Sequence, residues 1–105
     1  MKFPVVEKVN PGMTAGKPLE FADEAHKDLR YKMDLKKKGK IVGGGPFLDV
    51  VGDCYILETK TLEEMGKILF SSPSNIHVER EVHPLGSFED SYEGMAELLG
   101  KRHTK

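Results

Sequence analysis

The stretch Asn75-Ile-His-Val-Glu-Arg-Glu-Val-His83 has the alternation of a β-strand with one apolar face. Side chains alternate across a pleated strand, so Ile76, Val78 and Val82 share the side that suits a core. The opposite side carries four titratable side chains, those of His77, Glu79, Glu81 and His83. Such a side is typical either of a stripe that meets solvent or a partner, or of the wall of a polar pocket.

Upstream of this strand, apolar periodicity and turn residues predict three more strands and two helices. The first strand ends at the turn Asn10-Pro11-Gly12. The first helix begins at Pro18, whose missing N–H suits a first turn, and the second begins with a capping box from Thr61 to Glu64. The strands are expected over residues 3–9, 40–48 and 54–59, and the helices over 18–38 and 61–70.

The resulting order β-α-β-β-α-β is the split-βαβ or ferredoxin-like arrangement, so the predicted fold class is α+β. It implies a four-stranded antiparallel sheet with two helices on one face. The other face has no cover from its own chain, and we expect it to meet a partner or a ligand. This ferredoxin-like unit is assigned to residues 1–86, and a C-terminal helical extension to residues 87–105.

The C-terminal helix is expected to begin at Ser87 and to stop at Gly100. One of its faces is apolar and consists of Phe88, Tyr92, Met95 and Leu99. This surface must be buried on its own domain or on a second subunit, and we favour the second subunit. The expected partner is therefore another copy of the chain, giving a homodimer or higher homo-oligomer through the open sheet face and this helix.

Composition limits the classes of partner. The chain has 105 residues, enough for one compact domain. Sixteen basic and 17 acidic residues give a net charge of −1, which argues against a nucleic-acid partner. Cys54 is the single cysteine, so no intrachain disulfide forms. We expect no membrane association and a cytoplasmic location, because no apolar run reaches the length of a signal peptide or a membrane span.

The polar side of the strand at residues 75–83 supplies the first catalytic candidates, His77, Glu79 and His83. A histidine beside a carboxylate titrates in the range that a proton-transfer enzyme uses. Two histidines and a glutamate are also a ligand set for zinc or another divalent ion. The simplest alternative is a polar sheet face. We assign no metal and no cofactor.

A further candidate, His26, lies on a helix stripe with Ala25, Leu29 and Met33 and is expected to point toward the sheet. Tyr31 flanks this stripe and is a candidate pocket residue.

Glycines dominate the second strand at Gly43-Gly44-Gly45. A phosphate loop would lead into a helix, whereas Pro46 and another strand follow here. The run therefore favours a bulge or close backbone approach, with room for a small ligand near Gly44 and Phe47.

Three short motifs carry a resemblance to a known group of proteins: Lys38-Gly39-Lys40, Leu69-Phe-Ser-Ser-Pro73 and Glu81-Val-His-Pro-Leu85. With them the chain resembles the dimeric α+β barrel superfamily, and within it the muconolactone δ-isomerase family. The resemblance covers residues 25–86. It implies two ferredoxin-like subunits packed sheet against sheet, each with a pocket between sheet and helices, and a reaction that needs only proton movement.

The hairpin departs from that family, which typically carries tryptophan and arginine there, whereas this chain has no tryptophan. Its Gly43–Phe47 stretch is similar to the YCII-related proteins, another branch of the superfamily. In that branch a histidine of the first helix is associated with an acidic partner. This second resemblance implies a pair formed by His26 and Asp49.

Two functions follow. The first is a small-molecule-binding enzyme, an isomerase-like proton-transfer catalyst for a small organic acid or lactone. Its catalytic candidates are His26, His77, Glu79 and His83, and its ligand-binding candidates are Tyr31, Gly44, Phe47 and Asp49. The alternative is a non-catalytic oligomeric ligand-binding or scaffold module. A closed pocket with His26 or His77 facing a carboxylate favours the enzyme, whereas ion pairs filling a sheet-to-sheet gap favour the module.

Overall fold

The structure is a computed structural model that describes residues 1–9, 18–75 and 78–103. These residues form four strands and three helices in the order β-α-β-β-α-β-α. The strands are β1 (Lys2–Val9), β2 (Ile41–Pro46), β3 (Gly52–Glu58) and β4 (Val78–Val82). The helices are α2 (Pro18–Lys37), α3 (Leu62–Phe70) and α4 (Phe88–His103).

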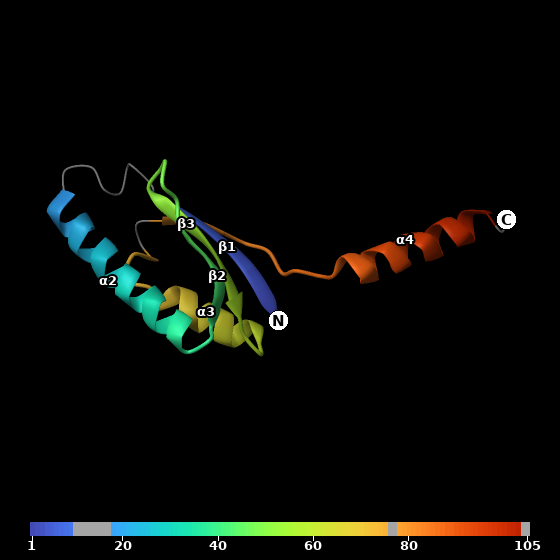
Figure 1. The fold of residues 1–105 in the computed structure, drawn as a ribbon, viewed down its shortest axis with the longest axis horizontal. Coiled ribbons are helices and arrows are strands. Elements are labelled where there is room, and N and C mark those ends of the chain that lie inside the picture. The colour runs from blue at the N-terminus through green and yellow to red at the C-terminus, as the bar shows by residue number, and fades with distance from the viewer. Residues whose placement is uncertain (10–17, 76–77, 104–105) are drawn as a thin grey trace.

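The strands form one antiparallel sheet in the order β2-β3-β1-β4. Helices α2 and α3 lie together on one side of this sheet (Figure 1). This is the predicted α+β ferredoxin-like fold, and β4 pairs with β1 as the split-βαβ order requires. The other side of the sheet has no helix of the compact unit over it (Figure 1).

The core lies between the sheet and the two helices. It begins with a row of apolar side chains that face one another across the strands, Phe3 with Leu57 and Leu57 with Ile41. In the next row Val5 lies opposite both Tyr55 and Val82. Leu35 of α2 and Leu69 of α3 complete the buried cluster. The alternation of each strand therefore turns its apolar side to the helices.

The glycines of β2 produce the predicted irregularity. The β2–β3 register shifts between Ile41 and Gly43, and Gly44 has a φ of 101°. A Cβ atom on Gly44 would lie 2.1 Å from the carbonyl oxygen of Cys54. The backbone of β2 approaches β3 too closely there for any side chain, which confirms the predicted close approach.

The capping box of α3 is confirmed in one half. Thr61 Oγ1 accepts a hydrogen bond from the Glu64 amide at 3.1 Å. The Glu64 carboxylate, expected to bond the Thr61 amide, instead accepts from the Lys60 amide at 3.2 Å and pairs with Lys40. That pairing ties the start of α3 to the end of the α2–β2 connection.

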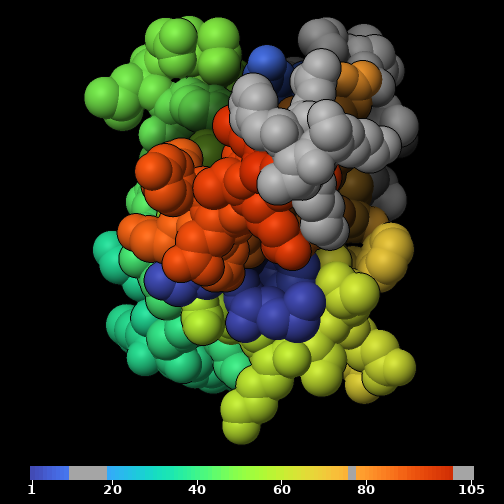
Figure 2. All heavy atoms as spheres, turned by 90° about the vertical axis from the view of Figure 1, so that its right-hand side faces the viewer, coloured from blue at the N-terminus to red at the C-terminus, as the bar shows by residue number. Residues whose placement is uncertain are grey.

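Helix α4 projects away from the compact unit on the side opposite α2 and α3 (Figure 1). Seen from that side, it stands in front of the rest of the molecule (Figure 2). Ser87 accepts a hydrogen bond from the Asp90 amide at 3.0 Å and so caps its start. The helix continues through Gly100 to His103, so the expected stop at Gly100 is wrong. The division at residue 86 stays a prediction.

None of the described helices is long and apolar enough to cross a membrane. The cytoplasmic location stays a prediction.

Candidate functional site

A row of three charged side chains crosses the helix-facing side of the sheet. Glu7 of β1 lies directly opposite Asp53 of β3 on one side and Arg80 of β4 on the other. The row follows the apolar rows at Phe3 and Val5, because residues two apart on a strand face the same way. Glu7 and Asp53 are buried, and Glu7 is among the most enclosed side chains described.

Lys32 of α2 binds all the acidic side chains that surround it. Its Nζ lies 2.7 Å from Glu7 Oε1, 2.6 Å from Asp28 Oδ2 and 2.5 Å from Asp53 Oδ2. Asp28 is one helical turn earlier on α2, so the two side chains share the inward face of that helix. A lysine ammonium has three donors, and here each donor has a carboxylate.

The two outer ends of this cluster are anchored to other parts of the fold. Arg80 places Nε 2.8 Å and Nη2 2.6 Å from Glu7 Oε2, and its Nη1 donates to Asn75 Oδ1 at 2.6 Å. Ser72 Oγ donates to Asp28 Oδ1 at 2.5 Å. The cluster therefore joins the turn after α3 to α2 and to three strands.

The charges of Glu7 and Lys32 are fixed by their surroundings. Burial alone would raise the pKa of Glu7, but Lys32 and Arg80 together hold it below its ordinary value. Burial would lower the pKa of Lys32, yet hydrogen bonds to Asp28, Asp53 and Glu7 raise it above the usual lysine range. Both groups are charged at neutral pH.

Asp53 is the titratable member of the cluster. Burial raises the pKa of its carboxyl from 3.8 to about 6; Lys32 opposes this rise, and the negative charge of Glu7 adds to it. The geometry agrees, because Glu7 contacts two cations whereas Asp53 contacts only Lys32 among the described residues. Asp53 Oδ1 is buried without a hydrogen-bond partner in that part of the chain. As the pH falls toward 6, the cluster therefore takes up a proton on Asp53 rather than on Glu7.

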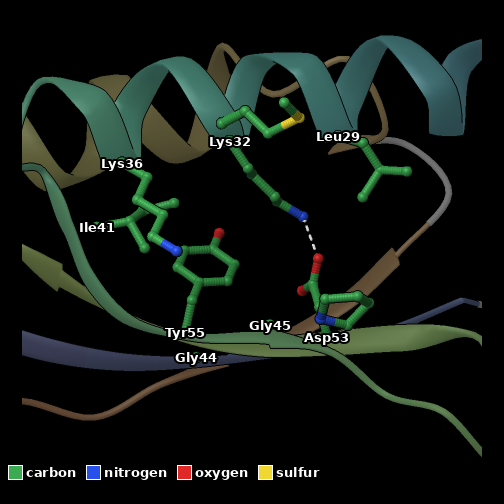
Figure 3. Close-up of a pocket in the computed structure, with 10 residues that line it drawn as sticks. Leu29, Lys32, Lys36, Ile41, Gly44, Gly45, Asp53 and Tyr55 are labelled. Carbon is green, nitrogen blue, oxygen red and sulfur yellow. Dashed lines mark hydrogen bonds and ion pairs between the residues drawn. The ribbon is translucent and has the colours of Figure 1, made fainter.

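A cavity of about 190 Å³ opens between α2 and the β2–β3 hairpin on one side of the Lys32–Asp53 pair (Figure 3). Tyr55, Gly44 and Gly45 form its floor, and Leu29, Lys32 and Lys36 reach down from α2 (Figure 3). Lys32 Nζ also lies 5.1 Å from the centre of the Tyr55 ring. Burial and the charges of Glu7 and Asp53 raise the pKa of Tyr55, so its hydroxyl stays protonated.

A second cavity, of about 290 Å³, lies on the other side of the same pair. Polar side chains, including those of Glu7, Asp28 and Ser74, line part of it. The rest of its lining is apolar and consists of Val9, Phe21, Ala25, Phe47, Val50, Val51 and Val78. Lys32 and Asp53 belong to both cavities, so the ion pair is the partition between them.

The structure corrects the predicted orientation of His26. Asp28, Tyr31, Lys32 and Leu35 form the inward side of α2, whereas His26 is exposed. The prediction assumed that the most apolar stripe faces the sheet. Here Lys32 and its carboxylate partners take that side, and Leu29 and Met33 lie at the edge of α2, partly exposed and lining the first cavity. A catalytic role for His26 stays a prediction.

The candidates on β4 lie on the open side of the sheet, away from both cavities. Val78 and Val82 face the helices as predicted, while Glu79, Glu81 and His83 are exposed. His83 Nε2 lies 3.9 Å from Glu81 Oε2. His77 lies outside the described residues. The roles of His77, Glu79 and His83 in catalysis stay predictions.

The ligand-binding candidates are distributed over different places. Gly44 lines the first cavity and Phe47 the second. Tyr31 points its hydroxyl at the Ile68 carbonyl, 2.7 Å away, and so ties α2 to α3. Asp49 is exposed in the β2–β3 turn and lines neither cavity. Their contact with a ligand stays a prediction.

The described residues include no group of three His, Cys, Asp or Glu side chains placed to hold a metal ion. The three carboxylates that do converge, Glu7, Asp28 and Asp53, have the Lys32 ammonium between them.

The five charged residues of this cluster, Glu7, Asp28, Lys32, Asp53 and Arg80, were missed from the sequence. The sequence does carry a signal for it. Glu7 lies two residues after Val5 and four after Phe3, so it shares their inward face of the strand, and Asp53 shares the inward face of Tyr55 and Leu57 in the same way. A charged residue in the inward register of a strand requires a buried partner. Arg80 likewise lies between Val78 and Val82 on the apolar side of β4.

Comparison with known proteins supports the fold. The chain matches no protein family, and no curated protein matches it in sequence. Its structure is similar to that of 5-chloro-2-hydroxyhydroquinone dehydrochlorinase (TftG) from Burkholderia phenoliruptrix AC1100 in complex with 2,5-dihydroxybenzoquinone. The TM-score is 0.66 with 22% sequence identity, over 86% of this chain and 98% of TftG.

This likeness shows a common fold. Membership of the dimeric α+β barrel superfamily stays a prediction. A closer relation to muconolactone isomerases or to YCII-related proteins stays a prediction.

Proposed function

We propose that this protein binds a small organic acid or lactone in the cavities between α2 and the sheet and catalyses an isomerisation by proton transfer, with Asp53 as the group that moves the proton. The observation that carries the proposal is the position of Asp53. Its carboxyl has a pKa of about 6, and its side chain lines both cavities. A group that titrates near the working pH serves as both base and acid.

The proposed step uses no redox partner. The Asp53 carboxylate takes a proton from the carbon next to the ligand carbonyl, so a C–H bond breaks and an O–H bond forms on Asp53. The electron pair moves into the carbonyl as an enolate. Asp53 then returns the proton to a more distant carbon of the conjugated system, and the double bond changes place. Atoms and charge balance over the two transfers.

Lys36 is the proposed anchor for an acidic ligand. It lines the first cavity, and among the described residues it has no ion-pair partner, whereas Lys32 has all its donors occupied. Tyr55, Ile41 and Met33 supply the apolar surface for the rest of the molecule. One cation beside apolar walls suits a monocarboxylate with a ring or a short hydrocarbon body.

TftG supports the size and kind of ligand. Its structure holds 2,5-dihydroxybenzoquinone, a small oxygenated ring, and the enzyme is a dehydrochlorinase. We infer a ligand of similar size for the cavities of this chain. The shared fold is support rather than assignment, because one fold carries many reactions.

We also propose that the chain forms a homodimer through the open sheet face. Pro4, Val6, Cys54 and Ile56 form a half-buried apolar strip on that side. Glu79, Glu81 and His83 continue the same side along β4 as an exposed polar border. An apolar strip with a polar border is the pattern of an interface. In this proposal the β4 stripe is interfacial, which was the alternative interpretation of its sequence.

The test is a ¹³C NMR titration of the aspartate carboxyls, in the free protein and with benzoate or γ-butyrolactone added. We expect the Asp53 signal to titrate near pH 6 and to shift with ligand. Asp53→Asn should abolish the exchange of solvent deuterium into the carbon next to the lactone carbonyl. The matched control, Asp23→Asn on the exposed side of α2, should leave both unchanged, because Asp23 lines neither cavity.

Lys36→Met tests the anchor in the same assay. It should weaken the binding of benzoate and leave the binding of the neutral lactone unchanged. An Asp53 signal that titrates near pH 4 and ignores both compounds would refute the enzyme and leave the non-catalytic module. Binding without deuterium exchange in the wild type would refute catalysis on these compound classes while keeping the ligand site.

A further inference from the structure

The apolar face of α4 is unburied along its length. Phe88 is 93% exposed, Tyr92 77%, Met95 60% and Leu99 49%. These side chains recur at three- and four-residue spacing and so share one side of the helix. A stable helix with an open apolar side requires a surface to cover it, and a second copy of the chain is the occupant that the following observations favour.

The exposed side of α2 offers a matching apolar stripe. Leu29 is 46% exposed and Met33 60%. Together with His26, Arg30, Asp34 and Lys37 they line a third, shallow hollow of about 410 Å³ on the outer surface of α2. Leu29 and Met33 also line the first cavity, so this stripe forms part of its mouth.

The facing parts of the two helices differ in charge. From Phe88 to Gly100, α4 carries Glu89, Asp90, Glu93 and Glu97 and no lysine or arginine, and Lys101 and Arg102 follow in its last turn. The apolar stripe of α2 is bordered by Arg30, Lys36 and Lys37 and by one acidic residue, Asp34. The acidic part of α4 therefore gains electrostatic complementarity on this side of α2 as well as apolar burial.

The α2 of the same chain is out of reach. The connection from β4 stays bound to β1 up to Leu85, whose amide donates to the Lys2 carbonyl at 3.1 Å. Only Gly86 and Ser87 then precede α4. Two residues span at most about 7 Å, less than the roughly 10 Å between packed layers. The helix starts on the open side of the sheet, and α2 lies on the other (Figure 1).

A second copy stacked on the open sheet face would lie on the side into which α4 projects (Figure 1). We propose that α4 of each copy packs on the exposed side of α2 of the other copy, over Leu29 and Met33, and closes the mouth of the first cavity. The inference rests on the homodimer of the proposed function, and it adds that each ligand site is completed by the other subunit.

Crosslinking of full-length protein tests this arrangement. In a Cys54→Ala background, Met33→Cys on α2 is combined with Met95→Cys on α4, and a short bismaleimide is added to a mixture of tagged and untagged chains. We expect covalent dimers that contain both forms. The matched control replaces Met95→Cys with Glu97→Cys on the opposite side of α4, and should crosslink at least fivefold less.

Light scattering on the wild type and on Met95→Asp separates the possible failures. We expect a wild-type dimer whose dissociation constant rises at least tenfold in the variant. A second outcome is a wild-type dimer whose cysteine variant crosslinks only within one chain or not at all. That result would overturn the packing of α4 on α2 of the other copy, and the sheet-to-sheet dimer would stand. A wild-type monomer at micromolar concentration overturns both. The ligand site is tested independently by the NMR titration of Asp53, so a monomeric wild type would not by itself refute the proposed ligand site.

Discussion

Glu7 and Asp53 lie directly opposite one another on β1 and β3, so two acidic side chains are neighbours on the buried side of the sheet. Lys32 lies within 2.7 Å of Glu7 and 2.5 Å of Asp53, and Arg80 adds a second cation to Glu7 alone. This asymmetry lowers the pKa of Glu7 and leaves that of Asp53 raised to about 6, so Asp53 is the first of the two carboxylates to take up a proton as the pH falls.

The first prediction concerns the pH dependence of stability. Asp53 has a pKa of about 6 in the folded chain and an ordinary value of 3.8, so the folded state binds a proton that the unfolded state releases between these values. The stabilisation of the folded state by this proton is present below about pH 4 and is lost as the pH rises through about 6. Two pKa units correspond to about 3 kcal/mol of unfolding free energy. The Asp53→Asn variant cannot ionise at this position, so its stability does not fall in this way.

Urea denaturation of wild type and Asp53→Asn from about pH 4 to pH 8 measures the effect. The stability of the variant relative to the wild type should rise by up to about 3 kcal/mol over this range. Asp49→Asn, in the exposed turn, should follow the wild type. Parallel curves for Asp53→Asn and wild type would show that Asp53 titrates as it does in the unfolded chain.

The second prediction concerns Lys32. Lys32→Met leaves Glu7, Asp28 and Asp53 without their shared cation, and an unpaired buried charge costs about 3–5 kcal/mol. The loss should shrink at about pH 5, where the uncompensated carboxyls become protonated. Chemical denaturation at the two pH values measures both effects.

Lys27→Met is the matched control for Lys32→Met, because Lys27 forms an exposed pair with Asp23 on the same helix. It should cost less than about 1 kcal/mol at either pH. A loss for Lys32→Met as small as that of the control would mean that the cluster contributes little to folding.

The fold could be predicted from the sequence because local signals agreed with one another. The alternation around Val78 and Val82 set the inward side of β4, and Pro18, Thr61 and Ser87 marked helix starts that the structure confirms. These signals act over a few residues, so they need no knowledge of the tertiary contacts.

The candidate site could not be predicted because it depends on pairing between distant residues. Lys32 and Glu7 are charged, so periodicity alone places them on the surface, whereas the structure buries them as partners. The apolar residues Leu29 and Met33 consequently lie at the partly exposed edge of α2, where they line the first cavity, and His26 is exposed. The orientation of α2 was set by a charge network among three strands and a helix, which a single-helix pattern cannot reveal.

The third prediction concerns the floor of the first cavity. Gly44→Ala would place a Cβ 2.1 Å from the Cys54 carbonyl oxygen at a φ of 101°. The backbone of β2 must move away from β3, so we expect a loss of about 1–3 kcal/mol and weaker binding of benzoate. Thermal unfolding and ligand titration measure the two effects.

Gly45→Ala is the matched control for Gly44→Ala. Gly45 lines the same cavity, yet nothing lies within 4 Å of its Cβ position. We expect its stability to change by less than about 0.5 kcal/mol. Equal losses for the two variants would contradict the close approach at Gly44.

The fourth prediction concerns the contact between the two helices that cover the sheet. Tyr31 donates its hydroxyl hydrogen to the Ile68 carbonyl at 2.7 Å, a bond between α2 and α3. Tyr31→Phe keeps the ring and removes the bond, so we expect a loss of about 0.5–1.5 kcal/mol in urea denaturation. Tyr92→Phe on exposed α4 should change the stability of the compact unit by less than about 0.5 kcal/mol. If Tyr31→Phe is as neutral as Tyr92→Phe, this hydrogen bond does not stabilise the contact between α2 and α3, because water then satisfies the Ile68 carbonyl equally well.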